Sequence, residues 1–185
     1  EVTAEAVRPE GPFANDIVAL DVSPDGTLWT ATGTVEFGSS NTSGVSWLVP
    51  GEGWRTVRAD DPDTGLPERE QFAITARPEG GALVGSAGGG LAVVTETGDV
   101  FPFDETNSTL RPAIGTSSFV VASAFAKEGD RWWVCNEGSP FPLHAFPGTE
   151  SATAADWTAL PSPPGAPTSF PVDEIVIDAF GQKWI

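Results

Sequence analysis

The sequence predicts an all-β fold in which one unit of four short antiparallel strands is repeated along the chain. A pattern of two apolar residues, a glycine and a Trp or Leu occurs four times. Its glycines are Gly26, Gly80, Gly129 and Gly181, which are separated by 54, 49 and 52 residues. One four-stranded blade of a β-propeller needs about 50 residues. The 185 residues include 21 Gly and 17 Pro, and no long amphipathic stretch is free of them, which favours many strands and turns.

The first repeat divides into four predicted strands. Residues 16–22 alternate well enough for an inner strand, and Pro24, Asp25 and Gly26 supply the tight turn that follows. The other three strands of this repeat are predicted at residues 27–32, 44–49 and 54–57.

The later repeats follow the same plan. Strands are predicted at residues 71–76, 82–86, 91–95 and 100–103, then at 119–126, 131–136, 142–146 and 156–160, and finally at 173–178 and 182–185. Segments rich in Pro, Asp and Ser separate the repeats, and they suit the return from an outer strand to the next inner strand. The predicted blades therefore lie at approximately 15–58, 70–104, 118–160 and 172–185, the last one truncated.

Three blades and two further strands are too few to close a propeller, for which about four blades is the lower limit. We therefore expect residues 1–185 to form an incomplete ring that belongs to a larger protein. Such an arc leaves apolar faces at both end blades, which would suit contact with a second copy of the chain.

Tryptophans recur at one place in the pattern and predict a buried layer between blades. The members of this layer are Trp29, Leu83, Trp132 and Trp184. Tryptophans on the outer strands are better candidates for partial exposure, although packing remains the favoured role; they are Trp47, Trp54 and Trp157. The apolar slots of the pattern contain two polar departures, Gln71 and Ser123.

The charge of the chain restricts its partners. It has 26 acidic and 9 basic residues and a net charge of −17, which repels nucleic acid and anionic lipid surfaces. The same balance suits a halophilic source or an ordinary acidic secreted protein. No apolar run approaches the ~20 residues that span a bilayer. The first residues carry no signal core, so we expect an export signal to have been removed already.

The residues that commonly perform catalysis or bind metals are sparse. There is one histidine, His144, one cysteine, Cys135, and no tyrosine, so we expect no metal, no cofactor and no catalytic triad. Both residues lie in predicted strands, where a packed structural role is favoured. The acidic turn from Asp60 to Gly65 lacks the spacing of a calcium loop.

The ends of the inner strands are the remaining candidates for a ligand site at the hub of the propeller. They carry Asp16, Arg69 and Glu70, a mixed set without a catalytic constellation. A binding role is therefore favoured, and a lyase or glycoside hydrolase centred at the hub is kept as an alternative.

The repeats resemble the two-component-regulator propeller repeat. That signature reads approximately Asn-Asp-x-Ile-x-x-Ile-x-x-Asp-x-x-Gly-x-Leu-Trp-Ile-Gly-Thr. The first repeat shows Asn15-Asp16-Ile17, Gly26 and Leu28-Trp29, with Ser23 where the family usually has Asp. The fourth shows Ile175, Asp178, Gly181 and Lys183-Trp184-Ile185, and the second and third match in spacing more than in identity.

The resemblance implies a non-enzymatic propeller outside the cytoplasm, in the periplasm or on the outer cell surface of a bacterium. One group with such repeats contains the ectodomains of hybrid two-component histidine kinases, which sense ligands. Another is the PorZ-type propeller of the type IX secretion system, which the stretches around Trp157 and Ile175 resemble more. The partners implied are a protein, a glycan or a lipopolysaccharide, without insertion into the membrane.

Overall fold

The computed structural model describes residues 10–33, 44–67, 70–162, 164–165 and 172–185 of the chain. Within these residues the fold is all-β, and the only helix is a single 3-10 turn at Ala154–Asp156. Within the same ranges, no helix has the length and apolar character needed to cross a membrane.

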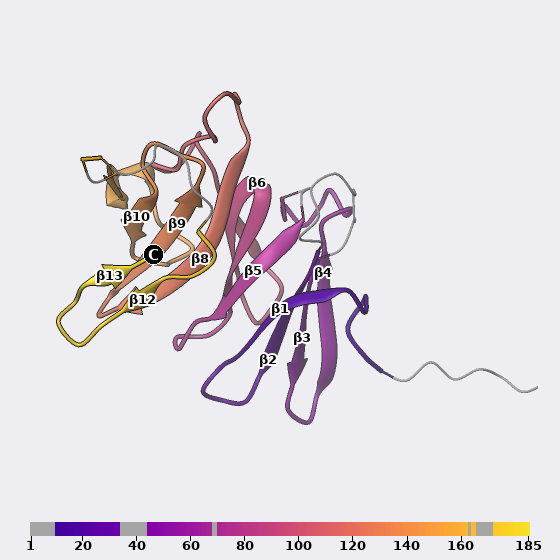
Figure 1. Cartoon of the computed structure of the whole chain (residues 1–185). Helices are drawn as coiled ribbons and strands as arrows, with labels where there is room; N and C mark the ends of the chain where they lie inside the picture. The colour runs from indigo at the N-terminus through magenta and orange to yellow at the C-terminus, as the bar shows by residue number, and fades with distance from the viewer. Residues whose placement is uncertain (1–9, 34–43, 68–69, 163, 166–171) are drawn as a thin grey trace, which may run out of the picture.

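The first sheet contains four antiparallel strands in chain order (Figure 1). The Asp25 carboxylate accepts a hydrogen bond of 3.0 Å from the backbone N–H of Thr27 and so closes the first turn of this sheet. All four strands were predicted from the sequence to within a few residues. They are β1 (Ile17–Val22), β2 (Leu28–Thr32), β3 (Gly44–Val49) and β4 (Gly53–Arg58).

The next seven strands form one continuous sheet. Its order is β11-β10-β9-β8-β6-β5, and β7 pairs with β6 beside this path. The 3-10 turn precedes the last of these strands, which begins later than the sequence predicted. The strands are β5 (Gln71–Ala76), β6 (Ala82–Val94), β7 (Val100–Phe103), β8 (Val120–Glu128), β9 (Arg131–Glu137), β10 (Leu143–Phe146) and β11 (Thr158–Leu160).

Strand β6 contains two predicted strands, since residues 82–86 pair with β5 and residues 91–94 pair with β7, and it joins two predicted blades. Gly88 and Gly90 have φ values of 117° and 79°, which side chains disfavour, so the strand can double back there. The two halves lie side by side. They are so close that a Cβ on Gly81 would come within 2.3 Å of the Val94 carbonyl oxygen. At this bend β6 also pairs in parallel with Val120 and Val121 of β8, which fuses the two sets of strands into one sheet.

A short hairpin of β12 (Val176–Ile177) and β13 (Lys183–Trp184) completes the described part of the chain. Its strands are shorter than predicted. Among the described residues neither strand pairs with the first sheet.

The core lies in three layers between successive sets of strands. The first layer joins the β1–β4 sheet to β5 and β6, and there Trp29 stacks on Trp47 with ring centroids 5.0 Å apart. The second lies between β6 and β8–β10 and includes Trp132 and Trp157, and the third packs Cys135 against the segment before β12. Burial of these apolar side chains is the main stabilising contribution to the arrangement.

The favoured packing role of the outer tryptophans is confirmed for two of them, whereas one member of the predicted buried layer is exposed. Trp47 and Trp157 are 1% and 5% exposed, because the sheets cover both faces of the outer strands, whereas Trp54 is half-buried. Trp184, which was predicted to be buried, is 62% exposed, because among the described residues no further sheet packs on that face of β13.

The register of the strands also corrects the sequence alignment of the third repeat. The β8–β9 turn contains only Gly129 and Asp130, since Glu128 pairs with Arg131. The apolar slot held by Leu20 and Ile74 is therefore filled by Phe125, and Ser123 is no departure from it. By the same register, the equivalent of Trp29 is Trp133 and not Trp132.

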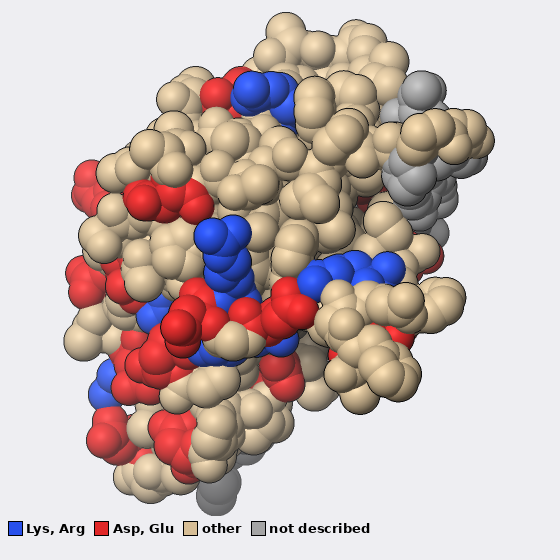
Figure 2. All heavy atoms as spheres, turned by 90° about the vertical axis from the view of Figure 1, so that its left-hand side faces the viewer, with Lys and Arg blue, Asp and Glu red and all other residues tan. Residues whose placement is uncertain are grey.

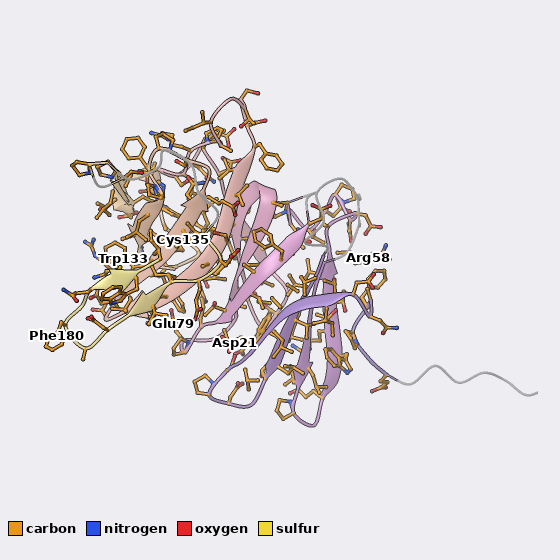
Figure 3. All side chains as sticks on the ribbon, viewed as in Figure 1. Asp21, Arg58, Glu79, Trp133, Cys135 and Phe180 are labelled. Atoms are coloured by element: carbon orange, nitrogen blue, oxygen red, sulfur yellow. The ribbon has the colours of Figure 1, made fainter. Side chains whose placement is uncertain are left out.

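Acidic side chains at the turns connect one set of strands to the next. Glu79, in the β5–β6 turn, pairs with Lys127 of β8 and accepts a hydrogen bond from the indole of Trp132. Glu128, at the end of β8, pairs with Lys183 of β13 at 2.7 Å. Figure 3 shows Glu79 at its turn, on the side of the molecule where the hairpin ends gather. Each contact crosses from one repeat to the next and so supports their packing.

Candidate functional site

The inner strands share a local irregularity that identifies the centre of the molecule. The pairing of β1 with β2 skips Val18, that of β5 with β6 skips Phe72, and that of β8 with β9 skips Ser123. Each is a β-bulge, which bends its strand and changes the direction of neighbouring side chains. The three bulges occupy equivalent positions in their repeats.

The fourth repeat can be placed on the same scale. Val22, Ala76 and Ile177 each pair with the residue six positions later, across equivalent turns. Counting back along the chain from these pairs, Asp173 takes the position of the bulged residues. Glu174 takes the position immediately after the bulge.

These equivalent positions surround one cavity of about 380 Å³, which we call the hub pocket. Figure 1 shows the inner strands β1, β5, β8 and β12 following one another across the molecule. Every repeat contributes to the wall, and a cavity of this size is within the range of small-molecule sites. The lining residues are Val18, Ala19, Phe72, Ala73, Ile74, Thr75, Ser123, Ala124, Phe125, Asp173, Glu174 and Ile175.

The lining combines apolar walls with acidic and hydroxyl groups. Asp173 and Glu174 are exposed, and in the described part of the chain neither carboxylate pairs with a lysine or arginine. Ser123 is 7% exposed, and its Oγ has no hydrogen-bond partner. The hub pocket therefore contains negative charge and an unsatisfied hydroxyl group.

A nearby carboxyl group shows the effect of this negative charge. Burial, together with the negative charge of Asp173, raises the pKa of Glu137 at the end of β9 above its usual value. A like charge disfavours ionisation of a neighbouring acid, which is the expected effect where carboxylates gather without a cation.

Two of the residues that the sequence proposed for the hub, Asp16 and Glu70, are not part of this lining. Asp16 is exposed just before β1, and Glu70 is half-buried just before β5. Arg69 lies outside the described residues. Their role in ligand binding stays a prediction.

Sequence reasoning missed Asp173 and Glu174. The available signal was the contrast with the other repeats, which have Ala19, Ala73 and Ala124 where the fourth has Glu174. The contrast is visible even when the repeats are aligned on their glycines, because that alignment places Ala122 in this slot of the third repeat.

His144 and Cys135 are both buried, as predicted, and neither lines the hub pocket. The Nε2–H of His144 donates to the carbonyl of Phe141 and its Nδ1 accepts from Thr109, both at 2.9 Å. Burial raises the pKa of the Cys135 thiol to about 12, so it is a poor nucleophile at neutral pH.

The structure also describes the acidic turn that begins at Asp60. Asp60 pairs with Arg58, and the Asp61 carboxylate accepts a hydrogen bond of 3.1 Å from the backbone of Asp63. No cluster of three or more potential metal ligands occurs among the residues described.

The fold resembles propeller-like domains of known structure. The structure of PorZ, an essential bacterial surface component of the type-IX secretion system of Porphyromonas gingivalis, matches with a TM-score of 0.76 and 18% identity over 98% of this chain. The extracellular domain of the putative one component system BT4673 from B. thetaiotaomicron matches with a TM-score of 0.60 and 16% identity over 96%. A structure of BT4673 described as a putative hybrid two component system matches at 0.53 and 14% over 96%.

The chain spans only part of these proteins, covering 24%, 20% and 27% of their respective lengths. No protein-family model and no curated protein sequence matches the chain. At these identities the likeness establishes a shared fold.

Proposed function

We propose that this chain is a non-enzymatic binding domain that works outside the cytoplasm and forms part of a β-propeller. In this proposal the β1–β4 sheet, the strands β5–β7 and the strands β8–β11 are three blades, and the β12–β13 hairpin begins a fourth. The successive antiparallel pairing within each set and the apolar layers between sets support this arrangement.

The observation that carries the proposal is the hub pocket. A cavity of about 380 Å³ lies where residues from all four repeats converge, and its lining includes no histidine, cysteine, lysine or arginine. Such a lining can hold a ligand through carboxylates, a hydroxyl group and apolar contacts. Its described residues include no pair of a histidine with a hydroxyl or thiol group, the arrangement that activates a serine or cysteine nucleophile.

Among extracytoplasmic roles, we favour a scaffold of the PorZ kind in type IX secretion. The higher TM-score of the PorZ match, 0.76 against 0.60, supports this choice. The second candidate is the ligand-sensing ectodomain of a two-component system, which the BT4673 matches support. The scaffold role implies a protein, glycan or lipopolysaccharide partner.

A second copy of the chain is a further proposed partner, through the two end faces. Leu20 and Val22 of β1 are 62% and 53% exposed, and Phe180 at the opposite end is 89% exposed. Figure 3 shows Phe180 at the tip of the β12–β13 hairpin, pointing away from the other strands. Exposed apolar faces of this kind favour association.

A thermal-shift screen of the 185-residue chain against glycans, lipopolysaccharide and short peptides tests the proposed function. Each compound that raises the unfolding temperature is then incubated with the protein and analysed for products by mass spectrometry. We expect stabilisation of the folded chain by mass action and recovery of the compound unchanged.

The enzyme alternative predicts a different outcome. Formation of a product that is lost on changing Asp16→Asn or Glu70→Gln would overturn the binding role. A screen in which no compound stabilises the chain would also contradict it.

A further inference from the structure

The fourth repeat departs from the others at the position that faces the centre. Three repeats place alanine after the bulge, at Ala19, Ala73 and Ala124, and the fourth places Glu174 there. Small side chains fit most easily where the inner strands converge. The carboxylate is therefore a special feature of one repeat and not a requirement of the scaffold.

The adjacent position strengthens this contrast. Asp173 takes the place of the bulged residues Val18, Phe72 and Ser123, so two neighbouring carboxylates enter the lining from one repeat. None of the five described carboxylates that pair with a lysine or arginine lines the hub pocket.

An independent observation also indicates a missing ligand group. Ser123 lines the same cavity, and its buried Oγ lacks a hydrogen-bond partner. A buried hydroxyl group without a partner is destabilising. It can accept a hydrogen bond from a donor that enters the hub pocket.

Part of the remaining wall is apolar. Val18, Phe72 and Phe125 line the hub pocket beside the acidic and hydroxyl groups. A ligand that carries a positive group on an aliphatic stem would match both parts of this surface, since the stem can pack on the apolar wall and the charged end can reach the carboxylates.

We propose that the hub pocket binds a primary ammonium group on an aliphatic stem, held by Asp173 and Glu174 with Ser123 as a further acceptor. This inference rests on the proposed binding function and specifies the chemical class of its ligand. Two sources present this group, a free alkyl diamine and the side chain of a lysine in a peptide.

Isothermal titration calorimetry at low ionic strength tests the inference. The probes are cadaverine as a free diamine, Nα-acetyl-lysine methylamide as a peptide side chain, and Nα-acetyl-norleucine methylamide as the same stem without charge. We expect binding of at least one amine and none of the norleucine derivative. Comparison of the two amines distinguishes the sources.

Substitutions locate the binding. Asp173→Asn and Glu174→Gln should each weaken amine binding about tenfold, the usual effect of losing one charge-assisted hydrogen bond. The matched control is Asp130→Asn, which removes one exposed negative charge at the β8–β9 turn, outside the lining. This control should leave the affinity within about twofold of the wild type, because salt screens distant charges.

Several results would overturn the inference. One is no binding of either amine, and another is equal binding of the uncharged derivative. A third is equal weakening of amine binding by all three substitutions, which would indicate attraction to the net charge of −17 alone. Calcium bound in preference to the amines would also contradict it. If the amines fail while another compound in the thermal-shift screen binds and loses affinity on Ser123→Ala, the ligand class is wrong and the proposed function stands.

Discussion

The indole Nε1 of Trp29 donates a hydrogen bond of 3.0 Å to the hydroxyl of Ser23, and both groups are buried. The same relationship recurs at equivalent positions of two other repeats. Trp133 donates to Glu128 at 2.8 Å, and Trp184 donates to Asp178 at 3.1 Å. In these three repeats the polar residue that follows or ends the inner strand thus serves as the acceptor for the tryptophan of the next strand.

The second repeat has lost both members of this pair. Leu83 stands where the other repeats have tryptophan, and Arg77 stands where they have the acceptor. Without an indole donor to satisfy, Arg77 reaches the next repeat instead. Its guanidinium donates to the Gly148 carbonyl at 2.7 Å and pairs with Glu150 at 2.6 Å.

The first prediction concerns the buried indole of the first repeat. Ser23→Ala should lower the free energy of unfolding by about 1–3 kcal/mol, because it leaves the Trp29 Nε1–H without an acceptor. Urea denaturation followed by tryptophan fluorescence measures the change. The exposed Ser118→Ala is the control and should have little effect. Equal stability of the two variants would refute the structural role of the pair.

The second prediction concerns the contact made by Arg77. Arg77→Met keeps most of the aliphatic stem but removes three donors, and it should destabilise the fold by about 2 kcal/mol. Arg131→Met, at an exposed position at the start of β9, is the matched control. Both are measured by urea denaturation. A loss no larger than that of the control would show that the contact with Gly148 and Glu150 contributes little.

The third prediction concerns pH. Burial, with a smaller contribution from the charge of Arg111, lowers the pKa of His144 from 6.5 to about 4. Between these two values the unfolded chain binds a proton and the folded chain does not, so stability falls as the pH drops through this window. The full effect is about 3 kcal/mol.

Urea denaturation at a series of pH values tests this prediction. His144→Gln should flatten the dependence between pH 4 and 6.5 relative to the wild type, whatever its effect on stability at neutral pH. Because His144 is the only histidine, its ring resonances report the folded pKa directly by NMR. A folded pKa near 6.5 would contradict the buried neutral ring.

The sequence was sufficient to predict most strands, because turn glycines and apolar spacing determine where strands begin and end. It could not predict the parallel pairing of the Gly88–Gly90 bend with β8, since this pairing joins two different repeats. It also placed Trp184 in a buried layer, because spacing within one strand does not show whether a neighbouring sheet covers it.

The site was harder to predict than the fold. Its position depends on bulges at Val18, Phe72 and Ser123, and a bulge shifts register without changing the apolar pattern. Asp173 and Glu174 read as ordinary acidic residues in a chain of net charge −17. Figure 2 shows how many acidic side chains share the face at the C-terminal end of the molecule, so charge alone does not single out this pair.

The most direct test of the central claim, that the four repeats converge on a binding site, is an NMR titration of the ¹⁵N-labelled chain with Nα-acetyl-lysine methylamide. We predict that the largest amide shifts fall together at Val18, Phe72, Ser123 and Asp173, which are far apart in sequence and meet only at the hub pocket. Shifts centred on the exposed hairpin tip at Phe180, or spread evenly over the acidic surface, would contradict it.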